Sequence, residues 1–484
     1  MNNPAISESE KQGGFKKKLL RNIFVAGGYN YLSQILVFLS SIITSRLLSP
    51  ESFGTVGLIT AFTGFILVFS DGGISYALIR SEYGRLFQRI LTNVSWLLGI
   101  VLCGITVLLA WPIAKFYNNP ALTLPTIILG FNFIIRSISL TSGAVLSKQL
   151  QFGYIGKVTL ICNSLAALTT IILAWFGFGF WSLIYPQLII SVLTAIFYER
   201  KVGFGFKIFP WSHIVVCFKH TKRLLGSILG FNAINYWARN SDNIIVGKYY
   251  GAADLGIYNR AYSLLTLPVV LISGIFNNVL FPSLKELKLK GGDTEKEFFF
   301  VLKLVSFITM PPVILLLVAP QELVLLLWGK NWVSVAELLP YFGLLIFTQN
   351  LISSITPVLI LNGKEKSFFI MGTVNAVILV TAILIGALYS VVGVARFYSL
   401  AYLLVTIPFT IAYGYIYVMK YEVWTTLKFW IPRIVFSTLI WLGIYYGSYV
   451  FQMASLSGLL IYLLIDGRTE LIKGKAMITR RFKK

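Results

Sequence analysis

The chain has 484 residues, of which 57% are hydrophobic and 12% are charged, and its formal net charge is +23. Because about a quarter of the residues of a soluble domain are charged, this composition excludes a soluble globular protein. It indicates an all-α polytopic membrane protein, since the apolar runs are far longer than the strands of a membrane β-barrel. The basic residues lie mostly between these runs, which is typical of membrane-protein loops and argues against a nucleic-acid partner.

About fourteen apolar segments are predicted to cross the bilayer as helices. In chain order they span residues 22–48, 54–79, 90–114, 121–147, 154–176, 179–198, 222–250, 255–283, 298–319, 335–361, 367–389, 392–418, 430–451 and 454–466. The last segment is the shortest. Without it, the chain would have thirteen spans and an external C-terminus.

The distribution of Lys and Arg predicts the orientation of these spans. If the N-terminus is cytoplasmic, 33 of the 41 basic side chains fall on inner segments and 6 on outer segments, while Arg136 and Arg239 lie inside spans. This asymmetry follows the positive-inside rule and favours an even number of spans. We therefore expect a cytoplasmic N-terminus (1–21) and a basic cytoplasmic tail (467–484) after two final spans (430–466).

The sequence contains an internal repeat with a shift of 202 residues. The shift superposes identical residues, namely Arg21 and Arg223, Gly28 and Gly230, Asn30 and Asn232, Gly54 and Gly256, and Gly72 and Gly274. Six spans separate the copies, so both enter the membrane from the same side, as in transporters built from two parallel six-helix lobes. The predicted lobes are 22–198 and 222–418. The aromatic and basic connector 199–221 is expected to lie along the cytoplasmic membrane surface.

Polar side chains form one stripe on the leading helix of each predicted lobe. At about 100° per residue, each stripe falls within roughly 100° of a helical wheel. The stripes comprise Asn30, Gln34, Ser41, Thr44 and Ser45 in the first lobe, and Asn232, Asn235, Arg239, Asp242 and Asn243 in the second. Because charge inside a bilayer is costly, we expect the stripes to border one central cavity. Two alternatives are that these residues hydrogen-bond helices together and that Arg239 and Asp242 form an i,i+3 ion pair.

Two interpretations apply to the other charged residues that lie inside spans or near span ends. Asp71 precedes Gly72 and either caps a kink or binds a coupling proton or cation. Arg136 either lines the pathway or snorkels inward, and snorkelling also accounts for cations near outer span ends. These last cations are Arg46, Lys248 and Arg260, of which Arg46 and Lys248 are also predicted to belong to the pathway. Since Arg and Lys pair strongly with phosphate oxygens, the excess of cations suits an anionic cargo.

Enzyme signatures are missing from the sequence. It has no glycine-rich phosphate loop with its lysine and no His-Glu-x-x-His motif. Three cysteines and two histidines, none with zinc-ligand spacing, argue against a metal site. We expect no enzymatic activity and no bound cofactor, with transport driven by a proton or sodium gradient.

Four stretches carry a family resemblance: SRLLSPESFGTVGL at 45–58, GFGFWSL at 177–183, RNSDNIIVGKYYGAADLGIY at 239–258 and LWGKNW at 327–332. They resemble the polysaccharide (lipopolysaccharide/O-antigen-type) flippase family of the multidrug/oligosaccharidyl-lipid/polysaccharide (MOP) exporter superfamily. The resemblance implies a multi-pass protein of the bacterial inner membrane. It implies two six-helix bundles around a cationic cavity and alternating access. The implied cargo is an undecaprenyl-pyrophosphate-linked oligosaccharide.

The resemblance also bears on individual residues and partners. Arg239 and Asp242 match the family's Arg-Asn-x-Asp stretch, and Arg46 lies in its first-loop motif. Implied partners are the lipid-linked oligosaccharide, membrane lipid, and polysaccharide polymerase or export proteins. Two alternatives stay open: a cation-coupled multidrug exporter of the same superfamily, which would rely on buried carboxylates, and a non-transporting scaffold for polysaccharide assembly.

Overall fold

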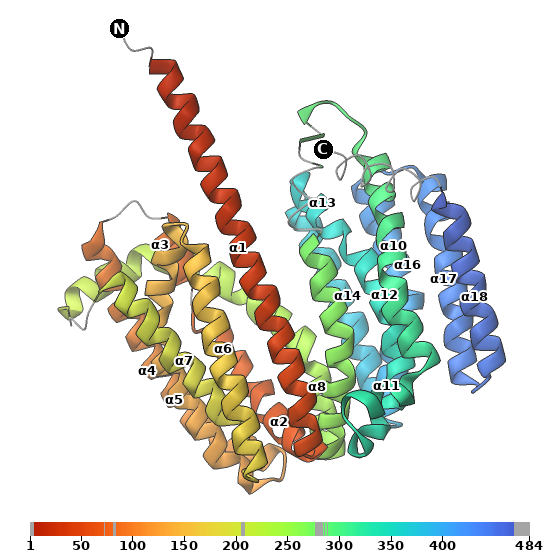
Figure 1. Ribbon diagram of the computed structural model, residues 1–484, viewed down its shortest axis with the longest axis horizontal. Helices are drawn as coiled ribbons and strands as arrows, with labels where there is room; N and C mark the ends of the chain where they lie inside the picture. The colour runs from red at the N-terminus through yellow and green to blue at the C-terminus, as the bar shows by residue number, and fades with distance from the viewer. Residues whose placement is uncertain are drawn as a thin grey trace. The chain divides into compact units, whose positions relative to one another are not determined.

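The computed structural model describes residues 4–71, 73–80, 84–204, 209–275, 284, 286–287 and 289–468, and these form helices joined by turns, without a strand (Figure 1). The chain divides into two compact units, Met1–Gly256 and Ile257–Lys484. Helix α8 (Trp211–Ile275) continues from the first unit into the second. It includes residues 211–221 of the predicted connector.

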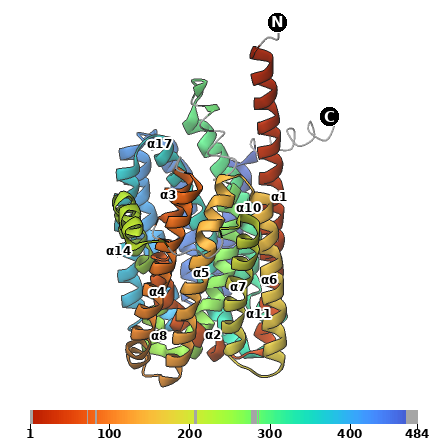
Figure 2. The same cartoon turned by 90° about the vertical axis from the view of Figure 1, so that its left-hand side faces the viewer.

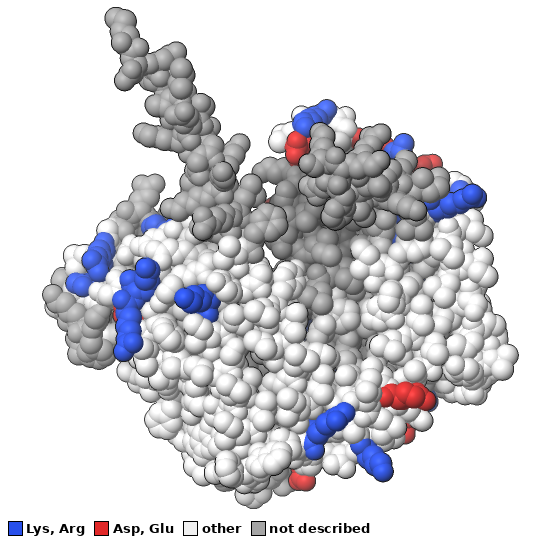
Figure 3. All heavy atoms as spheres, viewed as in Figure 1, with Lys and Arg blue, Asp and Glu red and all other residues white. Residues whose placement is uncertain are grey.

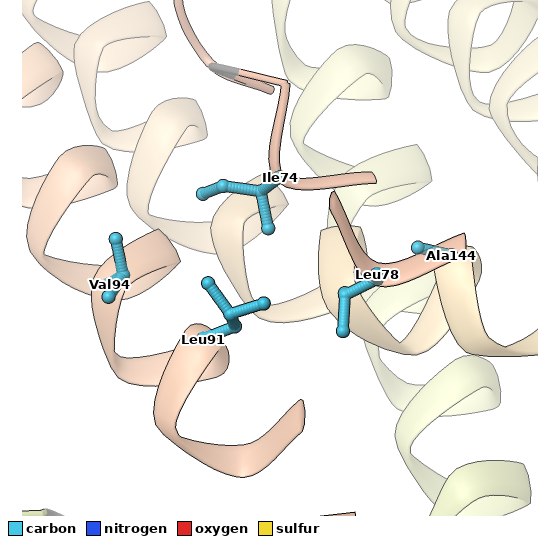
Figure 4. Close-up of a cluster of buried hydrophobic side chains, with 5 residues drawn as sticks. All are labelled: Ile74, Leu78, Leu91, Val94 and Ala144. Carbon is cyan, nitrogen blue, oxygen red and sulfur yellow. The ribbon is translucent and has the colours of Figure 1, made fainter. Parts of the chain in front are cut away.

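The first unit is a bundle of long antiparallel helices. Its elements are α1 (Pro4–Leu47), α2 (Pro50–Val68), α3 (Ile74–Arg80), α4 (Arg85–Phe116), η1 (Pro120–Leu122), α5 (Thr123–Lys148), α6 (Phe152–Trp175), α7 (Trp181–Val202) and the start of α8. Helix α1 packs mainly on α6, while α4, α5, α6 and α7 lie side by side (Figure 2). An apolar cluster joins α3, α4 and α5 through Ile74, Leu78, Leu91, Val94 and Ala144 (Figure 4).

The second unit contains the remaining described helices. They are α10 (Thr294–Val318), α11 (Pro320–Leu327), η3 (Lys330–Glu337), α12 (Leu339–Ser353), α13 (Ile355–Leu361), α14 (Glu365–Gly386), α15 (Val391–Ala401), η4 (Tyr402–Thr406), α16 (Ile407–Thr410), η5 (Ile411–Val418), α17 (Val423–Tyr445) and α18 (Tyr449–Asp466). Segments η4 and η5 are π-helical. Here α10 packs on α12, α14 on α15 and α17 on α18.

Eleven helices or helix pairs among the described residues are long and apolar enough to cross a membrane. Each overlaps one predicted span, and the other three predicted spans fall on α1 and on the two ends of α8. On the face drawn in Figure 3, charged side chains lie toward the ends of the helices, and the middle of each unit is free of them. The apolar middle confirms the all-α polytopic class.

Three predicted spans differ from the structure. The span 54–79 is broken, because α2 ends at Val68 and the chain turns through Gly73, whose φ of +78° suits glycine. The span 335–361 is divided at Ser354 between α12 and α13. The span 430–451 was placed too late, since α17 runs from Val423 to Tyr445. Its end is set by Gly447, which has a φ of +66°.

Large exposed aromatic side chains mark one end of several helices. They are Trp111 of α4, Trp175 of α6, Tyr249 of α8, Tyr389 after α14 and Tyr446 after α17. Trp and Tyr are enriched at membrane–water interfaces because their rings are amphipathic. All five helix ends are outer ends in the predicted topology.

Candidate functional site

Helix α1 presents three distinct faces. The face that packs on α6 includes the buried Ser33, whose hydroxyl accepts a 2.8 Å hydrogen bond from Asn163 Nδ2. About a quarter-turn to one side, Asn30 and Gln34 are exposed, with Val37 as an apolar neighbour. About a quarter-turn to the other side lie only exposed apolar side chains, namely Leu32, Leu39 and Ile43. Because lipid suits the apolar side, the polar side of α1 is the one that can face water.

The polar stripe of α1 changes character along the helix. Thr44 and Ser45 are buried, and their hydroxyls donate to the carbonyl oxygens of Ser40 and Ser41 within the helix. These two residues therefore contribute to helix packing. The part of the stripe that can meet a ligand is its other end, at Asn30 and Gln34.

The stripe of α8 is described from Tyr236 onward. The side chains of Asn232 and Asn235 lie outside the described residues. Arg239 is exposed, whereas Asp242 is 5% exposed and its Oδ1 accepts the backbone N–H of Asn243 at 2.8 Å. Both Arg239 and Asp242 belong to the described part of the chain, and no ion pair joins them. The i,i+3 pair is therefore not formed, and the Arg239 guanidinium lies at the surface of α8.

Contacts with α2 fix the rotation of α8 beside this stripe. The Tyr236 hydroxyl donates to the carbonyl oxygen of Ala61 at 2.8 Å. The Trp237 ring lies 4.9 Å from the ring centre of Phe65 and 6.3 Å from that of Phe62. These contacts pack Tyr236 and Trp237 against α2, whereas Arg239 is exposed.

Lys248 and Arg46 lie at helix ends. Lys248 Nζ donates to the carbonyl oxygen of Phe116, the last residue of α4, and lies 4.7 Å from the centre of the Phe116 ring. Arg46 is in the last turn of α1. Cations are stabilising at helix C-termini, where carbonyl groups lack partners. This placement gives Lys248 a capping role in addition to its predicted place on the pathway.

Asp71 and Arg136 occupy different surroundings. Asp71 Oδ1 accepts the backbone N–H of Ser75 at 3.0 Å in the first turn of α3. This hydrogen bond favours the interpretation of Asp71 as a cap. Arg136 is exposed in the middle of α5, so its guanidinium remains open to a ligand. The structure does not bring Asp71 together with Arg239.

A buried ion-pair network in the second unit was missed by the sequence analysis. Arg433 of α17 is 2% exposed, and its Nη2 lies 2.8 Å from Asp466 Oδ2 of α18. Lys303 of α10 approaches Asp466 Oδ1 at 3.2 Å, and Arg433 Nε donates to Ser306 Oγ at 3.3 Å. Arg433 is one of the 33 basic side chains assigned above to inner segments, and this assignment was wrong because it lies inside α17. Its position inside an apolar run was the available signal.

Arg260 is also buried, which corrects its interpretation as a snorkelling side chain. It is 9% exposed, and its guanidinium carbon lies 5.7 Å from the ring centre of Trp328 and 5.5 Å from that of Trp332. Cations are attracted to the faces of aromatic rings. The two tryptophans of the LWGKNW stretch thus hold an arginine of α8 within the second unit.

The fold is that of solved membrane transporters. The lipid II flippase MurJ in its inward closed conformation matches 93% of this chain and 100% of its own, with a TM-score of 0.68 and 16% identity. An inward-facing multidrug resistance transporter of the MATE family, in the MOP superfamily, matches 80% of this chain and 95% of its own, with a TM-score of 0.63 and 16% identity. The protein therefore shares the fold of these transporters.

Sequence comparison narrows this class to one family. Residues 43–337 match the family of polysaccharide biosynthesis proteins, and the chain belongs to it. The lipopolysaccharide biosynthesis protein WzxC of Escherichia coli K12 is 27% identical over 76% of this chain and 74% of its own length. The succinoglycan biosynthesis transport protein ExoT of Rhizobium meliloti is 23% identical over 77% and 75%. The protein is a polytopic helical membrane protein of this polysaccharide biosynthesis family.

Proposed function

We propose that the protein moves undecaprenyl-pyrophosphate-linked oligosaccharide repeat units from the inner to the outer leaflet by alternating access. The observation that carries this proposal is Arg239, an exposed arginine on an apolar helix with no ion pair in the described part of the chain. An arginine at bilayer depth needs an anionic partner or water. A pyrophosphate supplies the partner, because the guanidinium fork matches phosphate oxygens in a bidentate pair.

The amide side chains of Asn30 and Gln34 complement this role. Each offers an acceptor oxygen and two N–H donors, which suit the hydroxyl groups of sugars. Both lie on the side of α1 opposite Leu32, Leu39 and Ile43. In the proposed mechanism, sugars meet the polar side of α1, and the polyprenyl chain remains in the lipid.

The proposed topology has fourteen spans with both termini in the cytoplasm of a bacterium. In addition to the eleven candidate spans, the proposed count includes α1 and the two parts of α8. These two parts lie on either side of Gly251, whose φ of +83° interrupts the helix. The excess of Lys and Arg on the predicted inner segments supports this orientation. We propose that spans one to six and seven to twelve form the two lobes, with α17 and α18 as the final pair.

Deleting the gene and restoring it with variants tests the function. Without the protein, lipid-linked repeat units are expected to accumulate on the inner leaflet, and surface polymer is expected to be lost. Arg239→Ala should reduce transport at least tenfold with normal membrane insertion, and Arg239→Lys should restore part of it. Lys115→Ala is the matched control, because Lys115 is an exposed cation that lies over the Trp111 ring.

Two outcomes would overturn the proposal. Unchanged lipid-linked pools with altered drug tolerance would favour a multidrug exporter. Full transport by Arg239→Ala would remove the proposed pyrophosphate contact.

A further inference from the structure

Two glycines of the first unit meet at a backbone-to-backbone crossing of α2 and α8. A Cβ on Gly54 would overlap the carbonyl oxygen of Ala252 and lie 2.9 Å from the backbone nitrogen of Gly256. A Cβ on Gly256 would overlap the carbonyl oxygen of Pro50 and lie 3.1 Å from the backbone nitrogen of Gly54. Only glycine fits at either position without separating the helices.

The crossing is reciprocal under the sequence repeat. The 202-residue shift carries Pro50 onto Ala252 and Gly54 onto Gly256. Each glycine therefore contacts the carbonyl that is equivalent to the one its counterpart contacts. Such exchange of equivalent contacts is the mark of an interface with two-fold character.

The close contact continues along both helices. A Cβ on Gly247 would overlap Leu58, and a Cβ on Gly64 would overlap the Tyr236 hydroxyl. Before the interruption at Gly251, Leu58 and Gly64 of α2 meet Gly247 and Tyr236 of α8 in descending order, so α2 runs antiparallel to this part of α8. Gly256 lies beyond the interruption and meets the start of α2. We call this contact, from Gly54 with Gly256 to Gly64 with Tyr236, the glycine seam. Small residues allow helix backbones to approach closely in a membrane.

We propose that the glycine seam is the outer seal of the transport path, closed in this structure, and that α2 and α8 must part along it before cargo leaves. This inference rests on the proposed transport function. Arg239 lies on α8 between Tyr236 and Gly247, so the seam contacts at Gly247 and Gly256 are on the side of Arg239 that is outer in the proposed topology. A headgroup bound at Arg239 cannot pass outward between α2 and α8 while these backbones touch.

A reversible cross-link across the seam tests the proposal. In a chain whose three native cysteines are replaced by alanine, Leu58→Cys with Gly247→Cys would place two thiols at a point of van der Waals overlap between α2 and α8. Oxidation is expected to form the disulfide and to reduce flipping of lipid-linked oligosaccharide at least tenfold. Reduction is expected to restore it.

The matched control pair is Thr106→Cys with Gly130→Cys, which joins α4 to α5. A Cβ on Gly130 would lie 3.3 Å from the Cβ of Thr106, and the two helices pack within the same bundle. Oxidation of this pair should leave transport unchanged. Undiminished transport by a fully cross-linked Leu58→Cys, Gly247→Cys protein would overturn the seal. Failure of the reduced and wild-type proteins to flip the lipid would instead overturn the proposed function.

A second measurement isolates the glycines themselves. Gly54→Ala in the Leu58→Cys, Gly247→Cys background should slow disulfide formation several-fold, because the new methyl group pushes α2 from α8. Gly104→Ala is the control, since a Cβ on Gly104 of α4 meets nothing within 4 Å. Equal rates of cross-linking in both backgrounds would show that the crossing is not closed in the membrane and would overturn the proposal.

Discussion

Arg433 on α17 and Asp466 at the end of α18 form a 2.8 Å ion pair in which the arginine is almost completely buried. The pair does not stand alone, because Arg433 Nη1 also donates to the carbonyl oxygen of Phe429 at 2.6 Å and Lys303 approaches Asp466 from α10. The last two helices are thus tied to the body of the second unit by charge as well as by apolar contact.

Removing one partner of this pair should be far more damaging than removing both. Asp466→Leu leaves Arg433 buried without its carboxylate, and breaking such a pair costs roughly 3–5 kcal/mol. Replacing both, as Arg433→Met with Asp466→Leu, should recover most of that stability. Thermal unfolding of the purified protein in detergent measures both effects. Equal stability of the single variant and the wild type would contradict this account.

Eleven of the fourteen predicted spans overlap candidate spans among the described residues, in the predicted order, because length and hydropathy determine what can cross a bilayer. The sequence could not show which embedded charges are exposed and which are buried in ion pairs. Arg239 and Arg433 both interrupt apolar runs, yet one is exposed and the other is sealed by Asp466, thirty-three residues away. Which cation pairs with a carboxylate depends on helix packing, and hydropathy does not determine how the helices pack.

Arg260 provides a second stability prediction. Its guanidinium lies against the rings of both Trp328 and Trp332, and Arg stacks on aromatic faces in a way that Lys does not reproduce. Trp332→Leu should therefore lower the unfolding free energy by roughly 2 kcal/mol or more through the lost cation–π contact and ring burial. Trp332→Phe should retain part of it. The same thermal measurement applies, and a larger loss from Trp332→Phe than from Trp332→Leu would argue against the aromatic contact.

Variants of Asp71 can distinguish its two predicted roles, which are capping a helix and binding a coupling proton or cation. Its Oδ1 accepts the Ser75 N–H, and an uncharged Asn side chain can make the same hydrogen bond. Asp71→Asn should therefore preserve transport, while Asp71→Ala should cost about 1 kcal/mol of stability. Transport at several pH values in membrane vesicles distinguishes the two roles. Loss of transport in a stably folded Asp71→Asn protein would assign the carboxyl to proton or cation coupling.

Variants of Lys248 and Arg239 distinguish a cation that caps a helix from a cation that binds the cargo. Its ammonium group donates to the last carbonyl of α4 and lies over the Phe116 ring, so it is already engaged within the first unit. Lys248→Gln keeps a donor at the α4 terminus, and it should transport at close to the wild-type rate with at most about 1 kcal/mol of lost stability. Arg239→Gln, which also removes one positive charge, should lose transport without losing stability. Both variants change the net charge by the same amount. Equal losses of transport would therefore mean that the overall charge attracts the cargo and that neither side chain contacts it specifically.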